Sequence, residues 1–244
     1  ADRYNQAMLN GILLTSTEPD RKTFSFDLFP SQIIDNIIIN KAFVPELPGE
    51  WAGGLIQVNT KDIPSKNFFN IQLGTSANTL VTGKDFFKDQ GGKTDWLGLD
   101  DGTRALPNGY TTKSNFDTSS IGAKTALGKT MSNNWAPVMT TAKPNISLQM
   151  NGGFAGTLWG KKIGGILGIN YANAYRFQDN VNNQNGIIDQ KFNPISALKD
   201  SKYFQDINMG AIAGLTMFLN PLNKISYKAI VSVKTANTYN SRLG

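Results

Sequence analysis

Two residue types that carry much of enzyme and metal chemistry are missing from this chain of 244 residues, which has no cysteine and no histidine. Their absence excludes disulfides, thiolate nucleophiles and Ser-His-Asp triads. Because imidazole and thiolate are the ligands that zinc and other transition metals prefer, we expect no such metal site. No pair of carboxylates stands out as an acid–base couple either. We therefore predict no catalytic residue, no metal, no cofactor and no enzymatic activity.

Charge is also scarce. Charged residues make up 17% of the chain, against about 25% in ordinary soluble domains. Glutamate occurs three times, the last at Glu50. The net charge of +6 is spread along the sequence rather than clustered, so nucleic acid is not an expected partner. Few charges among many small and uncharged polar residues are typical of strands with one lipid face and one wet face.

No hydrophobic run has the length and pattern of a membrane-spanning helix. The uncharged run Ile207–Asn223 has 17 residues, but its apolar residues recur with a period of two. Five segments alternate in this way, at 69–81, 145–159, 163–177, 207–219 and 225–239. In the second, for example, Leu148 and Met150 share one face and Gln149 and Asn151 the other. Strands this long exceed the usual five or six residues and match tilted transmembrane strands.

The connections between these segments alternate in length. Short connections lie at 160–162 and 220–224, and long ones at about 82–143 and 178–206. Short turns on one side and long loops on the other are typical of outer-membrane β-barrels, with the turns in the periplasm and the loops outside the cell. The alternative is a soluble β-sandwich, such as an extracellular adhesin, which would explain neither the strand lengths nor the unequal loops.

The stretch before the first long strand carries the most distinctive pattern. After the β-rich segment 33–41 comes Leu47-Pro-Gly-Glu-Trp-Ala-Gly-Gly-Leu-Ile-Gln-Val-Asn-Thr-Lys61. Gly53 and Gly54 permit a turn or a close backbone contact, and the residues after them alternate as in a strand. In order and spacing, residues 1–62 resemble the C-terminal half of the plug domain of TonB-dependent outer-membrane receptors of the Bacteroidetes type.

This resemblance implies a domain plan. Residues 1–64 are expected to be the C-terminal part of the plug, and residues 65–244 the first five strands of a transmembrane antiparallel β-barrel. Plugged transporters of this kind have about 22 strands, so we expect the sequence to be a fragment of a longer receptor in the outer membrane. Its implied partners are outer-membrane lipid, a TonB-type energy-transducing protein acting through a segment not present here, and, as a further candidate, a surface lipoprotein.

Two sets of side chains are candidates for a functional site. The segment 95–104 carries Trp96 and Arg104, which are candidate ligand-binding residues in the long first loop. The plainer interpretation of this segment is an Asp-Gly turn in which Arg104 pairs with a carboxylate. The second set comprises charges that the resemblance implies hold plug and barrel together: Glu18, Asp20 and Arg21 in the plug, and Arg176, Lys228 and Lys234 on the strands. The alternative for this set is solvated charge in a wet lumen.

Another pattern, Ala123–Thr130, fits a relaxed nucleotide-binding loop. It lacks the buried strand before it and the good helix after it that phosphate binding requires. A basic segment of a long loop is the better interpretation.

The resemblance implies a function in transport: import of a scarce, large ligand such as a siderophore, glycan or peptide, driven by the TonB complex of the inner membrane. The alternative is a passive porin, or a receptor-like barrel that serves as a structural or secretion component of the outer membrane.

Overall fold

The computed structural model describes residues 5–14, 16, 31–49, 51, 53–107, 109–110, 112–131, 136–188 and 191–244. The fold is mostly β and its sheets are largely antiparallel. The chain divides into two compact units. Unit 1 comprises residues 1–76, 145–173 and 206–235, and unit 2 comprises 77–144, 174–205 and 236–244.

A small four-stranded sheet forms the first part of unit 1. Its strands are β1 (Gln6–Leu9), β2 (Ile12–Leu13), β3 (Ile34–Asn40), which follows the short helix η3 (Ser31–Ile33), and β4 (Leu55–Thr60), in the order β2-β1-β4-β3. Strand β1 pairs parallel with β4, and the other pairs are antiparallel. Asn10 and Gly11 join β1 to β2 with φ angles of 52° and 84°, which is the Asn-Gly arrangement favoured in two-residue hairpins.

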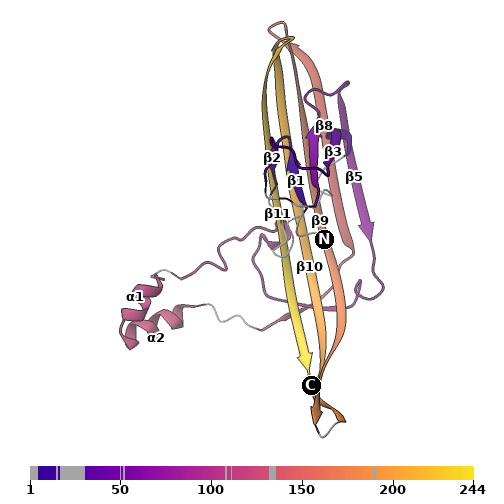
Figure 1. The fold of residues 1–244 in the computed structure, drawn as a ribbon. Helices are drawn as coiled ribbons and strands as arrows, with labels where there is room; N and C mark the ends of the chain where they lie inside the picture. Colours follow the sequence, from indigo (N-terminus) through magenta and orange to yellow (C-terminus); the bar gives the residue numbers. More distant parts are fainter. Residues whose placement is uncertain are drawn as a thin grey trace. The chain divides into compact units, whose positions relative to one another are not determined.

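A five-stranded sheet of longer strands forms the rest of unit 1 and continues into unit 2 (Figure 1). Its strands are β5 (Phe68–Ser76), β8 (Asn145–Leu158), β9 (Lys161–Ile188), β10 (Lys191–Asn220) and β11 (Asn223–Leu243), in the order β11-β10-β9-β8-β5. Ile71 lies opposite Met150, and Met150 opposite Ile169, so the apolar positions of neighbouring strands share one face. The turn after β10 is closed by the Asn220 side chain, whose oxygen accepts from the backbone N–H groups of Leu222 and Asn223.

The predicted alternation along these strands is confirmed, and its two faces have the reverse of the usual environments. The apolar face is exposed over all five strands, at Phe69, Ile71, Leu73, Ile146, Phe154, Leu167, Leu215, Ile225, Tyr227 and Val231. Within unit 1 most buried side chains of this sheet lie on the opposite face, including the polar side chains of Asn151, Asn170 and Thr216, and Ile207 is an exception. A sheet that buries amides and exposes aliphatic side chains is the inverse of a water-soluble surface.

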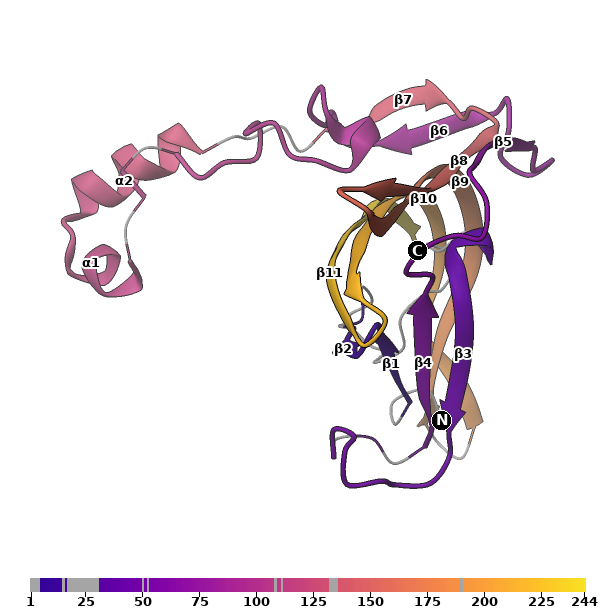
Figure 2. The same cartoon turned by 90° about the horizontal axis from the view of Figure 1, so that it is seen from above.

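The small sheet lies against the polar face of the five-stranded sheet (Figure 2). Ala7 and Val58 of the small sheet share one hydrophobic cluster with Ile166 of β9 and Ile212 of β10. A second cluster inside the small sheet joins Met8, Trp51 and Leu55. The expected domain boundary at residues 64 and 65 falls between β4 and β5, which belong to different sheets.

Unit 2 contains the connection between β5 and β8. The antiparallel pair β6 (Asp85–Lys88) and β7 (Val138–Thr141) is accompanied by η4 (Asp95–Leu97) and the helices α1 (Lys113–Thr118) and α2 (Ile121–Thr130). An aromatic core forms where the Phe86 ring meets Tyr175 and Tyr203, with centroids 5.2 and 5.5 Å apart. Neither helix has a buried residue. No helix in the described part of the chain has the length and apolar character needed to cross a membrane.

The prediction of a long loop at 178–206 is wrong. Strand β9 continues to Ile188 and β10 begins at Lys191, so strand occupies nearly all of this segment. The sequence here is polar on both faces, with Asn182, Asn183 and Asn185 in succession. Alternation of apolar and polar residues along a sequence shows which face of a strand is buried, whereas strand pairing needs only backbone hydrogen bonds. Strands that remain paired through polar residues therefore show no apolar–polar alternation in the sequence.

Candidate functional site

Asp62 stands where the two sheets of unit 1 meet. It follows β4 by two residues and contacts two lysines of β11. The Lys224 ammonium donates a short hydrogen bond to one carboxylate oxygen, and Lys228 Nζ lies 3.0 Å from the other. One carboxylate from the small-sheet segment thus pairs with the ammonium groups of two lysines that lie four residues apart on β11.

Lys228 extends this contact to the other strands of the small sheet. Its ammonium donates to the Asn10 side-chain oxygen at 3.0 Å and to the Thr60 carbonyl at 3.4 Å. The same Asn10 oxygen accepts from the backbone N–H and the hydroxyl of Thr60, at 2.9 and 3.0 Å. Lys228 therefore links β11 to the β1–β2 turn and to the end of β4 at once.

The electrostatics keep Asp62 ionised. Burial alone would raise the pKa of Asp62, but hydrogen bonds and charge interactions with Lys224 and Lys228 outweigh it and hold that pKa below its usual value. A lowered pKa means that the folded state gains stability from the ionised form, so the gain is present at neutral pH and is lost as the pH falls through the lowered pKa. We call Asp62, Lys224, Lys228, Asn10 and Thr60 the inter-sheet cluster.

A glycine of β9 lets the segment after β4 approach closely. A Cβ at Gly164 would lie 2.7 Å from Ile63 Cγ2 and 2.8 Å from the Phe154 carbonyl oxygen. Contacts this short do not occur for real Cβ atoms. The absence of a side chain at Gly164 therefore allows Ile63, next to Asp62, to pack on the wall of the five-stranded sheet.

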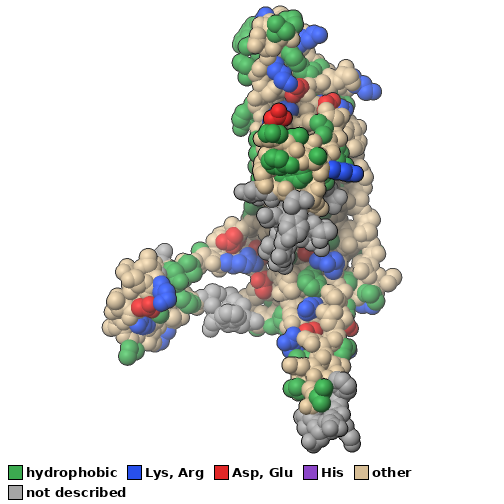
Figure 3. Space-filling model, in the orientation of Figure 1, with side chains coloured by type: hydrophobic (Ala, Val, Ile, Leu, Met, Phe, Trp, Pro, Cys, Tyr) green, Lys and Arg blue, Asp and Glu red, His purple; other side chains and the backbone are tan. Residues whose placement is uncertain are grey.

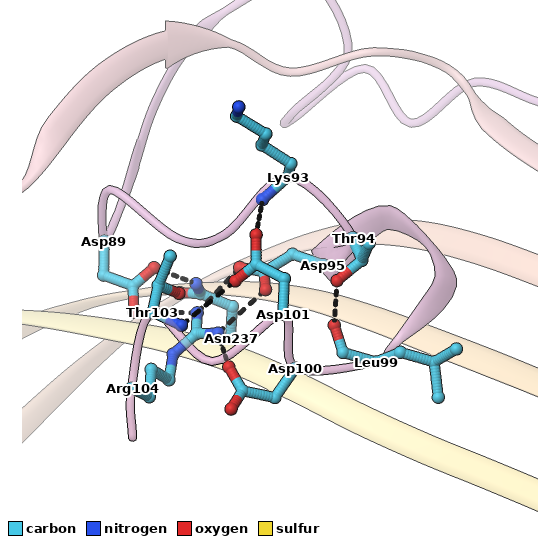
Figure 4. Close-up of polar contacts among 10 residues, drawn as sticks. All are labelled: Asp89, Lys93, Thr94, Asp95, Leu99, Asp100, Asp101, Thr103, Arg104 and Asn237. Carbon is cyan, nitrogen blue, oxygen red and sulfur yellow. Dashed lines mark hydrogen bonds and ion pairs between the residues drawn. The ribbon is translucent and has the colours of Figure 1, made fainter. Parts of the chain in front are cut away.

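The second charged arrangement lies in unit 2, in the segment 89–104 (Figure 4). The Arg104 guanidinium donates two hydrogen bonds to the Asp95 carboxylate, at 2.8 and 2.7 Å. Asp89 and Asp100 lie 3.5 and 3.7 Å away on its other sides. Hydrogen bonding from Arg104 lowers the pKa of Asp95, and Asp95 in turn raises the pKa of Arg104. Planar two-point pairing of this kind fixes both side chains.

Backbone contacts complete this loop. The Asp101 carboxylate accepts from the N–H groups of Lys93 and Thr103, at 2.7 and 3.2 Å. A Cβ at Gly92 would lie 2.4 Å from an Asp101 oxygen, so a larger residue there would displace the Asp101 carboxylate. Asn237 of β11 donates to Asp89 at 2.7 Å. The segment is thus an internally bonded loop held to a strand of its own unit, and we call it the Arg104 loop.

The structure places the predicted residues as follows. Arg104 pairs with carboxylates, as the plainer interpretation of the sequence expected. Trp96 lies in η4 of the same loop and is 57% exposed. Arg176 stacks over the Phe204 ring at 5.0 Å. Lys228 belongs to the inter-sheet cluster, and Lys234 lies further along β11 at a position of the same parity. Glu18, Asp20 and Arg21 lie outside the described residues.

Sequence reasoning missed the partners that Lys228 has. Asp62 sits in an unremarkable Lys-Asp dipeptide, and no local pattern connects it to a lysine 166 positions later, at 228. Asn10 did carry a signal, because Asn-Gly between short apolar segments predicts a tight turn. Its contact with β11 depends on the tertiary fold alone.

The described residues form neither a metal site nor a nucleotide-binding loop. No group of three or more carboxylates among them is arranged to hold a metal ion. The nucleotide-loop pattern at 123–130 falls within α2, an exposed helix capped by Ser120, rather than in a loop between a strand and a helix. A third charged arrangement in unit 2 is the two-point pair of Arg242 with the buried Asp200. Of the three, the inter-sheet cluster is the candidate for a fastening between sheets and the Arg104 loop is the candidate for a preorganised surface.

No protein-family model, curated protein or solved structure matches this chain.

Proposed function

We propose that this chain forms part of a TonB-dependent outer-membrane receptor, with the small sheet as the C-terminal half of its plug and the five-stranded sheet as the start of its barrel wall. The observation that carries the proposal is the inverted environment of the five-stranded sheet. Its apolar face is exposed and its polar face packs on the small sheet. Water would disfavour this arrangement and hydrocarbon would favour it, since exposed aliphatic faces of this extent mark contact with lipid or a partner.

The proposal requires more strands than the five described. A sheet that ends at β5 and β11 leaves two unpaired edges, and unpaired backbone groups are not tolerated in hydrocarbon. Further strands must cover both edges, from the same polypeptide or from a partner. The wet inner face then surrounds the small sheet, and transport requires the small sheet to move.

The inter-sheet cluster suits this role. Its contacts combine hydrogen bonds with ion pairs in a partly exposed position, where each is individually weak. An inner-membrane partner that pulls on the plug would separate Asp62 from Lys224 and Lys228 without breaking a large apolar interface. The cluster is therefore proposed to hold the plug at rest. The Arg104 loop is proposed to be part of the ligand-facing surface outside the cell, with Trp96 as its exposed aromatic side chain.

A ligand-independent experiment separates the receptor from a passive porin. Val58, 1% exposed in the cluster that joins the two sheets, is replaced by cysteine in this cysteine-free chain. Cells are treated with a maleimide that cannot cross the inner membrane, with and without a protonophore. The receptor proposal predicts faster labelling of Val58→Cys in energised cells. A matched cysteine at Leu106, exposed and outside the small sheet, should label equally in both conditions.

Labelling of Val58→Cys that does not depend on the proton gradient would contradict the receptor proposal. It would favour the passive porin or a structural barrel, in which nothing pulls the small sheet away from the wall.

A further inference from the structure

The turn between β8 and β9 has an unexpected residue at its tip. Trp159 and Gly160 both have positive φ, at 48° and 72°, as two-residue hairpin turns require. Asn, Asp or Gly normally takes the first position because a bulky side chain is strained there. The one other non-glycine residue with positive φ in the described ranges is Asn10, which follows this preference. Strain of this kind that persists points to function rather than folding.

Trp159 has no packing role in its own unit that would offset the strain. It is 84% exposed. The next two-residue turn, between β10 and β11, carries Leu222, which is 93% exposed. Since β8 and β10 run in the same direction in the sheet, both turns lie at the same end of its strands (Figure 1). Two large apolar side chains thus stand on the tips of adjacent hairpins.

The same end of the sheet is positively charged. Exposed Lys161 and Lys162 follow the first turn. Exposed Lys66 lies just before β5, in a segment that runs beside β8, where Asn67 accepts from the Ala155 N–H at 2.8 Å. Segments 145–173 and 207–235 contain five lysines and no acidic residue. Two carboxylates lie near this end: Asp62, which Lys224 and Lys228 already occupy, and exposed Asp35 of β3, beside the end of β4. Figure 3 shows hydrophobic and basic side chains at this end, with acidic side chains below them.

We infer that this end of the sheet docks on an anionic phospholipid surface: Trp159 and Leu222 enter the headgroup region, and Lys66, Lys161 and Lys162 bind lipid phosphates. An indole suits this boundary because its ring is apolar and its N–H can stay hydrated. The three lysines favour a negatively charged partner and disfavour a second copy of this basic end. Single side chains on narrow turns also offer no groove for a protein segment. The inference rests on the proposed function, which places the sheet in a membrane.

The test uses the complete polypeptide in vesicles of phosphatidylcholine and phosphatidylglycerol in equal amounts, with bromine on the acyl chains of one lipid at a time. Bromine quenches a tryptophan that touches the labelled lipid. The contribution of Trp159 is the difference between the wild type and Trp159→Asn. This substitution places a favoured residue in the turn, so it should leave the fold intact. We expect stronger quenching of Trp159 by brominated phosphatidylglycerol, because each lysine at an anionic surface raises local affinity about fivefold.

A triple variant, Lys66→Gln with Lys161→Gln and Lys162→Gln, should bring the two quenching values together while Trp159 remains quenched. Equal quenching by both lipids in the wild type would overturn the anionic specificity. No quenching of Trp159 by either lipid would overturn the docking itself and would indicate a water-facing or protein-facing turn.

A control separates failure of this inference from failure of the proposed function. Val231→Trp, in the Trp159→Asn background, reports on the exposed apolar face of β11. If Val231→Trp is quenched and Trp159 is not, the five-stranded sheet lies in the membrane but its turns do not contact phospholipid. If neither is quenched, the sheet does not lie in the membrane, and the proposed function is wrong as well.

Discussion

Replacement of Asp62 by asparagine should loosen the small sheet from the five-stranded sheet without unfolding either. The substitution removes the charge that holds Lys224 and Lys228 but keeps the size of the side chain. Lys224 is half exposed, and an exposed pair contributes about 0–1 kcal/mol. Lys228 is more buried and makes charge-assisted hydrogen bonds, each worth about 1.5–3 kcal/mol. A loss of about 2 kcal/mol in total is therefore expected.

Hydrogen exchange of the purified protein measures this loss directly. Amides of β4 that exchange when the sheets separate should exchange roughly 30-fold faster in Asp62→Asn, as a loss of about 2 kcal/mol requires. Lowering the pH should have a similar effect on the wild type, because the contribution of Asp62 is complete at neutral pH and declines as its lowered pKa is passed, below about pH 4. The Arg104 loop in unit 2 should keep its exchange rates in Asp62→Asn and serves as an internal control.

Lys228→Met completes a double-mutant cycle with Asp62→Asn. Because Lys228 also contacts Asn10 and Thr60, the single Lys228 variant should be the more damaging of the two. The double variant should be less damaging than the sum of the single ones, since the side chains interact directly. If the β4 amides exchange less than about threefold faster in Asp62→Asn, or if the two substitutions are additive, the inter-sheet cluster does not hold the two sheets together.

Three further predictions concern other parts of the chain. Leu148→Arg should impair membrane assembly by about 2–4 kcal/mol near mid-bilayer whereas Gln149→Arg should be tolerated, measured as the fraction of folded protein in outer membranes; equal effects would contradict the assigned faces. Arg104→Lys should expose the Arg104 loop to limited proteolysis, because an ammonium cannot pair with Asp95 at two points, and unchanged cleavage would show that the pair does not order the loop. Gly164→Ala should lower thermal stability, since the added Cβ would clash with backbone and with the segment next to Asp62; an unchanged melting temperature would argue against that close packing.

Strand positions in this protein could be predicted wherever one face of a strand is buried. The segment expected at 145–159 matches β8, whose bounds are Asn145 and Leu158, because apolar and polar residues alternate along its whole length. The extension of β9 from 178 to Ile188 could not be predicted in the same way. Its side chains are polar on both sides, and the hydrogen bonds that keep it in the sheet leave no trace in the sequence.

The candidate site, too, could be predicted only in part. Pairing of Arg104 with a carboxylate was predictable from the dense set of aspartates within a few residues of it. The inner position of Lys228 followed from its parity in the strand. Its partner Asp62 could not be predicted, because the contact joins residues 166 positions apart through the packing of one sheet on another. Local sequence determines which face a side chain occupies, whereas its partner depends on the tertiary fold.

In a membrane receptor the exposed apolar face of the five-stranded sheet contacts lipid while the opposite face is enclosed. Two neighbouring residues of β11 distinguish these environments: Val231, 60% exposed on the apolar face, and Ser232, whose hydroxyl is buried on the other. Cysteine is introduced at each position, and labelling by a water-soluble maleimide is compared in outer membranes and after solubilisation. We expect Val231→Cys to be unreactive in membranes and to be labelled by a lipid-soluble maleimide instead. Rapid labelling of Val231→Cys by the water-soluble reagent in membranes would show that this face meets water and that the sheet is not a membrane wall.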